Sequence, residues 1–290
     1  MNSAGQNKVF STNKTLNVGG RLLTLDTPLV MGILNVTPDS FYDGGRFTEE
    51  ASILKQVERM ISEGATIVDV GGYSSRPGAT DVSSDEEAGR VIQALQVIRK
   101  EFKDLIISVD TFRSAIARQA VAEGADMIND ISGGEPDKAM FETVADLNVP
   151  YICMHMKGTP QTMNTLASYE NLLTEITTWF SNKLATLSAH GVKDVIIDPG
   201  IGFAKTVEHN FELLSRLHLL SMLGKPMLIG LSRKSMIWRT LNTSPEWALN
   251  GTTALNMVAL LKGASILRVH DVKEAVELIT LFSKLNHESA

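Results

Sequence analysis

Chemically useful side chains stand at the ends of apolar runs along this chain. The run from Leu29 to Leu34 stops at Asn35, and a polar loop containing Pro38 and two glycines follows it. A polar amide at the end of a run that belongs in a core is more informative than an exposed polar residue, and it indicates a site. The same junction recurs at eight runs, and the polar residues at or just after their ends are Asn35, Ser75, Arg76, Asp110, Asn129, Asp130, His155, Asp198, Ser232, Arg233, Lys234, Arg268, His270 and Asp271.

These residues are of two chemical kinds. Carboxylate and amide groups, as in Asp110, Asn129 and Asp198, suit a flat heterocycle with several ring donors and acceptors. Cationic groups suit a bound anion, and they are Arg76, Lys234, Arg268 and His270. Asn35 adds a neutral oxygen that can join phosphate oxygens around Mg²⁺, an ion that keeps several waters and few protein ligands. A polar ring together with a polyanion indicates a substrate with a phosphate-type leaving group.

Taken singly, each position also has a structural explanation. Asp110 could cap a helix, Lys234 could be a solvated loop lysine, and His270 could be a structural histidine. The tripeptide Asp198-Pro-Gly could form a plain turn. Coincidence at the ends of all eight runs is much less expected, so the sequence favours one shared site.

Eight short apolar runs are the elements that must position these side chains. They are rich in Val, Ile and Met and do not alternate with polar residues, which is typical of strands buried on both faces of a parallel sheet. Between them the apolar spacing is helical, Ser84 with Glu87 forms a capping-box pattern, and glycines such as Gly64 and Gly124 end the helices. The expected strands cover 29–36, 66–72, 106–111, 127–133, 151–156, 195–200, 227–232 and 266–271.

Eight strand-and-helix units in 290 residues predict an α/β protein with a (β/α)8 (TIM) barrel. A doubly wound open sheet is the competing fold, but it usually has fewer strands and a glycine-rich phosphate loop, and no such motif is present. The segment from Leu16 to Leu25, with Gly19 and Gly20 at its turn, predicts an N-terminal β-hairpin that closes the bottom of the barrel. We therefore expect a polar tail over residues 1–14 and a single barrel domain over residues 15–290. Active sites of such barrels lie at the carboxyl ends of the strands, where the polar residues stand.

Composition argues against several other classes of protein. A net charge of −6 is unlike that of nucleic-acid binders, which are normally basic. The lone Cys153 lies in an apolar run, which excludes a disulfide framework and a cysteine metal cluster. Residues 1–20 lack the apolar core of a signal peptide, and no run approaches the roughly 18 apolar residues of a membrane span. We expect a globular, cytoplasmic protein.

Seven motifs make the chain resemble dihydropteroate synthase, a family of folate biosynthesis. They stand in order on successive expected strands, and the resemblance extends from about Leu16 to the final helix. The motifs are Gly32-Ile-Leu-Asn-Val-Thr-Pro-Asp-Ser-Phe41, Ser75-Arg-Pro-Gly78, Ser108-Val-Asp-Thr111, Ile128-Asn-Asp130, Asp198-Pro-Gly-Ile-Gly-Phe203, Ser232-Arg-Lys234 and Arg268-Val-His270. The resemblance implies a transferase that condenses 6-hydroxymethyl-7,8-dihydropterin diphosphate with 4-aminobenzoate and releases pyrophosphate.

By matched position, the resemblance assigns residues to the parts of one site. The pterin would be held by Asp110, Asn129, Met154, Asp198, Phe203 and Lys234. The pyrophosphate would be held by Asn35, Arg76, Arg268 and His270. The 4-aminobenzoate would contact Phe41, Ser75, Arg76, Pro77, Phe203, Ser232 and Lys234. The catalytic residues would be Asp110, Lys234, Arg268 and His270, and Mg²⁺ would lie beside Asn35.

The implied mechanism follows from charge. An aromatic amine is a poor nucleophile, so we expect departure of the leaving group to run ahead of C–N bond formation. Arg268, His270 and Mg²⁺ would stabilise the charge that builds on pyrophosphate. Asp110 and Asp198 would favour positive charge on the pterin. The loops 36–47 and 73–83 carry glycines and could close over the site to exclude water.

One loop departs from the family pattern. Tyr73 stands where the common family version has Glu, and Ser75 stands where it has Thr. Ser75 keeps a hydroxyl, so we expect its role to be retained. Tyr73 removes a carboxylate and leaves the hydrogen-bonding partners of this loop open.

Two alternatives use the same barrel. A pterin-dependent methyltransferase would keep the Asp110, Asn129 and Asp198 set, but it would need a corrinoid partner and not the cations. A pterin-binding barrel without catalysis could lose Asn35 and the loop residues freely. The resemblance further implies that sulfonamides target the protein and that it forms a homodimer through late helices, such as residues 254–261.

Overall fold

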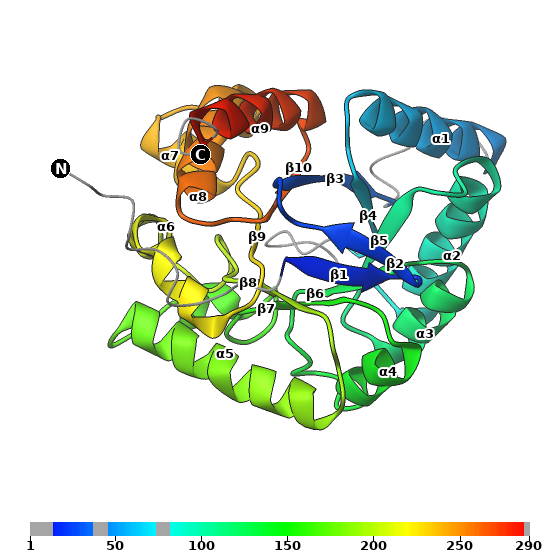
Figure 1. Cartoon of the computed structure of the whole chain (residues 1–290), viewed down its shortest axis with the longest axis horizontal. Coiled ribbons are helices and arrows are strands. Elements are labelled where there is room, and N and C mark those ends of the chain that lie inside the picture. Colours follow the sequence, from blue (N-terminus) through cyan, green and yellow to red (C-terminus); the bar gives the residue numbers. More distant parts are fainter. Residues whose placement is uncertain (1–13, 37–45, 74–81, 287–290) are drawn as a thin grey trace.

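Eight parallel strands form a barrel in the computed structural model, which describes residues 14–36, 46–73 and 82–286 (Figure 1). The sheet order is β8-β7-β6-β5-β4-β3-β10-β9, and a bridge between Ile197 and Met227 joins its two edges. The predicted (β/α)8 barrel is therefore confirmed. Its strands are β3 (Leu29–Asn35), β4 (Ile67–Gly71), β5 (Ile106–Asp110), β6 (Met127–Asp130), β7 (Tyr151–Met154), β8 (Val195–Asp198), β9 (Leu228–Ile229) and β10 (Ile266–Val269).

Helices form the outer layer, as Figure 1 shows. In α2, for example, Val91, Leu95 and Ile98 recur at helical spacing and are fully buried. The α-helices of the described residues are α1 (Arg46–Ser62), α2 (Ser84–Glu101), α3 (Ser114–Ala122), α4 (Met140–Leu147), α5 (Leu172–Ala189), α6 (Val207–Ser215), α7 (Ser235–Thr240), α8 (Leu249–Leu261) and α9 (Val272–Asn286). Short 3₁₀ helices cover Met163–Leu166, Leu217–Leu223 and Pro245–Trp247. No helix within the described ranges combines the length and apolar composition that crossing a membrane requires.

Helix ends follow the sequence signals with one correction. Gly64 and Gly124 have φ angles of 100° and 98°, which a residue without a Cβ adopts readily, and each turns the chain from a helix into the next strand. The expected capping box at Ser84 and Glu87 is wrong. Ser83 is the N-cap, and its hydroxyl accepts a hydrogen bond from the backbone N–H of Glu86 at 3.3 Å.

The predicted strand ends are too late, most clearly at β9. A strand was expected over 227–232, but only Leu228 and Ile229 pair with β10. The chain then turns, because the N–H of Lys234 donates to the carbonyl of Leu231 at 3.1 Å and Arg233 takes a left-handed φ of 54°. The turn removes the end of the apolar run from the sheet and directs the following residues over the barrel mouth.

An N-terminal hairpin covers the opposite end of the barrel. The strands β1 (Thr15–Val18) and β2 (Arg21–Thr24) pair around Gly19 and Gly20, as expected. The buried side chains of Leu16, Val18 and Leu25 pack on residues near the start of the barrel strands, among them Met31, Met127 and Ile196. The backbone N–H of Asn17 also donates to Asp194 at 3.1 Å, which ties the hairpin to β8.

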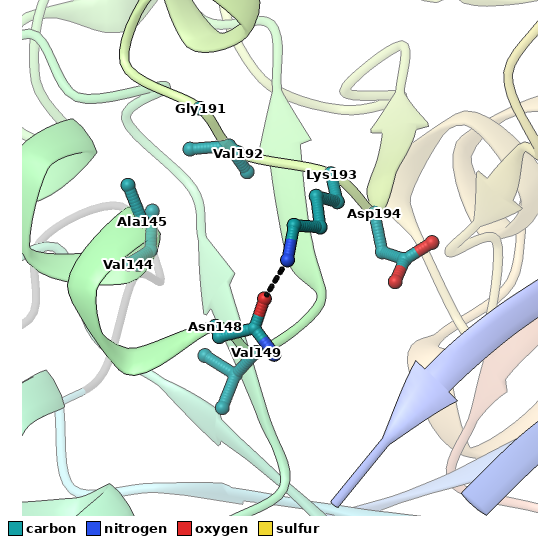
Figure 2. Close-up of a pocket in the computed structure, with 8 residues that line it drawn as sticks. All are labelled: Val144, Ala145, Asn148, Val149, Gly191, Val192, Lys193 and Asp194. Carbon is teal, nitrogen blue, oxygen red and sulfur yellow. Dashed lines mark hydrogen bonds between the residues drawn. The ribbon is translucent and has the colours of Figure 1, made fainter. Parts of the chain in front are cut away.

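A small cleft lies at this same end, between α4 and the start of β8 (Figure 2). Its lining includes Asn148, Lys193 and Asp194, and Figure 2 shows the ammonium of Lys193 reaching the side-chain oxygen of Asn148 at 3.0 Å. Because Asp194 directly precedes β8, the cleft lies at the amino ends of the strands, away from the predicted site.

Candidate active site

A charged network joins four strands inside the barrel mouth. Arg268 of β10 donates from Nε to Oδ2 of Asp69 at 2.7 Å and from Nη2 to Oδ2 of Asp110 at 2.9 Å. Asn129 of β6 donates its amide to the same Asp69 oxygen at 3.0 Å. Three residues predicted from the sequence, Arg268, Asp110 and Asn129, are therefore brought together by a fourth that was missed.

Asp69 is the missed residue. It lies in the middle of β4 and is fully buried. Its other carboxylate oxygen, Oδ1, has no hydrogen-bond partner among the described residues. A lone carboxylate inside the apolar run Ile67-Val-Asp-Val70 was the available signal, because a charge in a buried strand needs a partner.

Gly71, at the end of β4, lies between two other predicted residues, since it pairs with Asn35 of β3 and with Asp110 of β5. A Cβ atom on Gly71 would lie 3.6 Å from Cβ of Asp110 and 3.8 Å from Oδ1 of Asn35. The side chains of Asn35 and Asp110 thus border the same small space above β4. No group of three or more His, Cys, Asp or Glu in the described part of the chain could hold a metal ion by itself.

The β8 side of the mouth brings together four further predicted residues. Asp198 is buried, and its Oδ1 accepts a hydrogen bond from the N–H of Gly200 at 2.7 Å. The ammonium of Lys234 donates to the carbonyl of Ile201 and lies 4.7 Å from the ring centroid of Phe203. Met154 is buried in an apolar cluster against which Phe203 packs. This wall therefore offers a carboxylate, a cation and an apolar face.

Ser232 and His270 meet between the loops after β9 and β10. The hydroxyl of Ser232 lies 3.0 Å from Nδ1 of His270 and accepts a hydrogen bond from its backbone N–H at 3.1 Å. Arg233 and Asp271 form a bidentate ion pair, with both N–H···O distances 2.9 Å. This pair ties the two loops together, so we assign Arg233 and Asp271 to support and not to the substrate.

Burial shifts the pKa values of three site residues toward their neutral forms. It raises the pKa of Asp110 to about 8 against the opposing effect of Arg268, and nearby carboxylates, with Asp69 first, raise it further. Burial also raises the pKa of Asp198, against the effect of Lys234. The pKa of Lys234 falls to about 8 because burial outweighs the attraction of Asp198. Shifted pKa values in several titratable groups gathered at one end of a barrel are typical of an active site.

Two residues at strand ends have structural surroundings. The buried carboxylate of Asp130 accepts hydrogen bonds from the hydroxyl of Tyr151 at 2.6 Å and from the backbone N–H of Ser132 at 2.7 Å. His155 is buried behind the β8 loop, where its Nδ1 lies 3.0 Å from the ammonium of Lys205. Neither residue belongs to the network around Asp69.

Four predicted site residues, Phe41, Ser75, Arg76 and Pro77, lie outside the described residues. The unusual Tyr73 lies inside them. Its hydroxyl accepts a hydrogen bond from the amide of Gln161 at 2.7 Å, and its ring packs edge-on against Phe112 with the centroids 5.2 Å apart. Tyr73 therefore connects the loop after β4 to the loop after β7.

The fold and the site together define a pterin-binding barrel enzyme, and the pattern of the pterin binding enzyme family matches residues 31–270. Dihydropteroate synthase of Escherichia coli K12 is 44% identical over 261 residues, which cover 89% of this chain and 92% of that protein. The structure of Xanthomonas albilineans dihydropteroate synthase with 4-aminobenzoic acid has a TM-score of 0.88 and 39% identity, covering 95% of this chain and 99% of that one. Yersinia pestis dihydropteroate synthase in a sulfonamide drug complex also has a TM-score of 0.88 and 39% identity, covering 94% and 99%. The chain belongs to the dihydropteroate synthase family.

Proposed function

We propose that this chain joins 6-hydroxymethyl-7,8-dihydropterin diphosphate to 4-aminobenzoate in folate biosynthesis, forming 7,8-dihydropteroate and releasing pyrophosphate. The observation that carries the proposal is the network in which Arg268 donates to both Asp69 and Asp110. In this network the cation of Arg268, which we assign to the diphosphate, lies beside carboxylate and amide groups that suit a pterin ring.

The pterin is held by groups from both sides of the mouth. Asp110 and Asn129 on one side and Asp198 on the other offer hydrogen-bond partners for the ring edges, and Lys234 adds a donor. The apolar faces of Phe203 and Met154 cover the ring. Asn129 is held by its hydrogen bond to Asp69, and Asp198 by the N–H of Gly200, so little ordering of these two groups is left to occur on binding.

The reaction begins with departure of the leaving group. The C–O bond between the exocyclic methylene and the diphosphate breaks, and its electron pair leaves with pyrophosphate. Arg268 and His270 stabilise that negative charge, while Asp110 and Asp198, in their ionised carboxylate forms, stabilise the positive charge left on the pterin. The lone pair of the 4-aminobenzoate nitrogen then forms the C–N bond, and the nitrogen loses its proton to water.

Mg²⁺ is part of the proposal as a partner of the diphosphate. The donor set fits, because the amide oxygen of Asn35 borders the same space as Asp110 and the described residues provide no dense cluster of ligands. A magnesium ion bound by one neutral oxygen, substrate oxygens and water has its usual environment. When bound, it would neutralise charge on the pyrophosphate. Asn35 orients the diphosphate end of the substrate whether or not the ion is bound.

The second substrate lies above the pterin. Phe203, Ser232 and Lys234 contact 4-aminobenzoate, together with Phe41, Ser75, Arg76 and Pro77 of the loops. Its carboxylate reaches Ser232 and the N–H groups that begin α7, and the solved relative with 4-aminobenzoic acid supports this class of ligand. We also assign sulfonamides to this part of the site, as competitors of 4-aminobenzoate, on the strength of the relative in complex with a sulfonamide drug.

The assembly and the location remain proposals. Exposed apolar side chains on the late elements, with Leu261 of α8 60% exposed and Trp247 77% exposed, support a homodimer through the late helices. A cytoplasmic location remains a prediction from the sequence. The methyltransferase and non-catalytic alternatives have no observation in their favour, since the site carries the two cations, Arg268 and Lys234, that the synthase reaction would use.

A coupled assay of pyrophosphate release tests the function. Release that requires both the pterin diphosphate and 4-aminobenzoate is expected, and Arg268→Met should lower kcat/KM at least about 100-fold, since removing a donor to developing charge costs about 3 kcal/mol. Arg99→Met is the matched control, because Arg99 pairs with Asp126 at the opposite end of the barrel. Binding of pterin without any pyrophosphate release would show a binding protein and refute the proposal.

A further inference from the structure

A buried ammonium lies behind the site, within the loop after β8. Lys205 is buried, and its Nζ lies 3.1 Å from the carbonyl oxygen of Gly200 and 3.1 Å from that of Phe203. Its third neighbour is Nδ1 of His155, at 3.0 Å. None of the chemistry assigned above uses this lysine.

All three hydrogens of the ammonium find acceptors in this arrangement. An ammonium carries three donors and no acceptor, so two carbonyls and one ring nitrogen satisfy it completely. The ring nitrogen can accept because burial and the neighbouring Lys205 lower the pKa of His155 to about 2, which keeps the imidazole neutral. Burial lowers the pKa of Lys205 itself to about 7, although the attraction of Asp198 opposes that change.

The loop that Lys205 contacts has an unusual backbone. Gly200 and Gly202 have positive φ angles of 68° and 82°, and Ala204 has a φ of 49° although it carries a Cβ. The left-handed conformation is unfavourable for alanine, so surrounding contacts must hold it. The loop is also packed closely, because a Cβ on Gly200 would overlap the carbonyl oxygen of His155.

The same loop carries Asp198 and Phe203, which the proposed function assigns to the pterin. The N–H of Gly200 donates to Asp198, and the carbonyl of Ile201 accepts from Lys234, whose ammonium lies over Phe203. The carbonyl groups of Gly200 and Phe203 that Lys205 binds therefore belong to the peptide segment that orients Asp198 and Phe203.

We propose that Lys205 is a positioning residue. Its ammonium, hydrogen-bonded to Nδ1 of His155, holds the segment Asp198–Phe203 in the conformation that presents Asp198 and Phe203 to the pterin ring. The identity of the ligand rests on the proposed function, but the clamp itself does not. Lys205 acts through the loop and does not touch the substrate.

Hydrogen exchange of the free protein tests the clamp without any ligand. Lys205→Met removes the ammonium and keeps most of the apolar stem, so the amides of the peptide covering 198–206 should exchange at least about 10-fold faster. The peptide covering β5, residues 106–110, should be unchanged. Lys193→Met is the control, because Lys193 bonds only to Asn148 among the described residues and lies at the other end of the barrel.

A pair of variants at His155 separates the contact from general packing. The side-chain amide of asparagine would offer an oxygen near the position of Nδ1, so His155→Asn should retain slow exchange, whereas His155→Leu removes the acceptor and should lose it. These variants also keep the test intact if Lys205→Met fails to fold.

Binding of 6-hydroxymethylpterin, measured by calorimetry, tests the positioning role. The Kd should rise about 10- to 100-fold in Lys205→Met and about 10-fold in His155→Leu, and it should stay within about threefold in His155→Asn and Lys193→Met. Unchanged exchange in Lys205→Met would overturn the clamp. Faster exchange with an unchanged Kd would overturn the positioning role. If the unmodified protein does not bind the pterin, the proposed function fails, while the exchange result still decides the clamp.

Discussion

Removing Asp69 should uncouple the charged network from the rest of the site. Asp69→Ala leaves two donors without their acceptor, Nε of Arg268 and Nδ2 of Asn129, which lie 2.7 Å and 3.0 Å from Asp69. An unsatisfied buried donor costs about 1–3 kcal/mol. Part of this is offset, because the buried charge and the unpartnered Oδ1 of Asp69 disappear, and because Arg268 keeps its bond to Asp110. We expect a net loss of about 2 kcal/mol in the free energy of unfolding.

The effect on activity should be of similar or larger size. Arg268 and Asn129 would both lose the group that orients them, and an interaction worth about 2–3 kcal/mol in the transition state corresponds to a loss of about 30- to 150-fold in kcat/KM. Asp69→Asn keeps one acceptor oxygen for the two donors, although it replaces the other oxygen with an amide NH₂ group and removes the charge, so its loss in kcat/KM should be about fivefold. Pyrophosphate release gives the kinetics, and urea unfolding gives the stability.

Asp126→Ala is the matched control for this prediction. Asp126 also serves two donors, the guanidinium of Arg99 and the backbone N–H of Ile107 at 2.9 Å, but it lies at the amino end of β6. Its removal should reduce stability while kcat/KM stays within about threefold of the unmodified enzyme. If Asp69→Ala and Asp126→Ala have equal kcat/KM, Asp69 has no role in orienting the site and the reasoning is refuted.

Four further outcomes follow from the geometry. The pKa of Asp110 is about 8 in the folded protein and about 3.9 when unfolded, so the folded state binds this proton more tightly. The resulting contribution to stability is complete below about pH 4 and is lost as the pH rises to about 8. Urea unfolding of Asp110→Asn should therefore lack this decline with pH. Ala204→Gly should leave the free energy of unfolding unchanged or raise it by up to about 1 kcal/mol, measured by thermal unfolding. The strain relieved at the left-handed φ of 49° exceeds the extra conformational entropy that glycine loses on folding. A clear loss of stability would contradict this. Gly71→Ala should fold normally, since its Cβ meets only ordinary contacts of 3.6 Å or more. Its kcat/KM should nevertheless fall about 10-fold, because the methyl group enters the space bordered by Asn35 and Asp110. Unchanged kinetics would show that the substrate does not use this space. Removal of Mg²⁺ with a chelator should lower pyrophosphate release at least about 10-fold, and failure of added Mg²⁺ to restore it would count against the metal.

The strand starts could be predicted and the strand ends could not. The apolar runs begin at Ile106, Tyr151 and Val195, where β5, β7 and β8 begin. A strand was expected over 127–133, but β6 ends at Asp130. The carboxylate of Asp130 accepts hydrogen bonds from the N–H groups of Ser132 and Gly134, so these residues form a turn and do not continue the strand. A hydrogen-bonded ladder depends on the neighbouring strand, which a local apolar pattern does not contain.

The site shows the same division. Asn129, Asp110, Asp198 and Arg268 could be found from sequence because the ends of parallel strands meet at one edge of a barrel. Asp69 was missed because its partner, Arg268, stands 199 residues further along the chain. Its significance depends on a contact that only closure of the sheet creates.

By itself, the sequence determined the number of strand-and-helix units, the hairpin at the bottom and the set of polar residues at the mouth. Those properties are local, since they follow from apolar spacing, turn residues and the residue types at the ends of the runs. Only the tertiary structure decided which of these polar residues are partners. It placed Arg268 between Asp69 and Asp110, and it brought the ammonium of Lys205 within hydrogen-bond distance of His155, behind the loop that carries Asp198. Charges buried together depend on distance in space and on the exclusion of water, and neither quantity is present in the order of the residues.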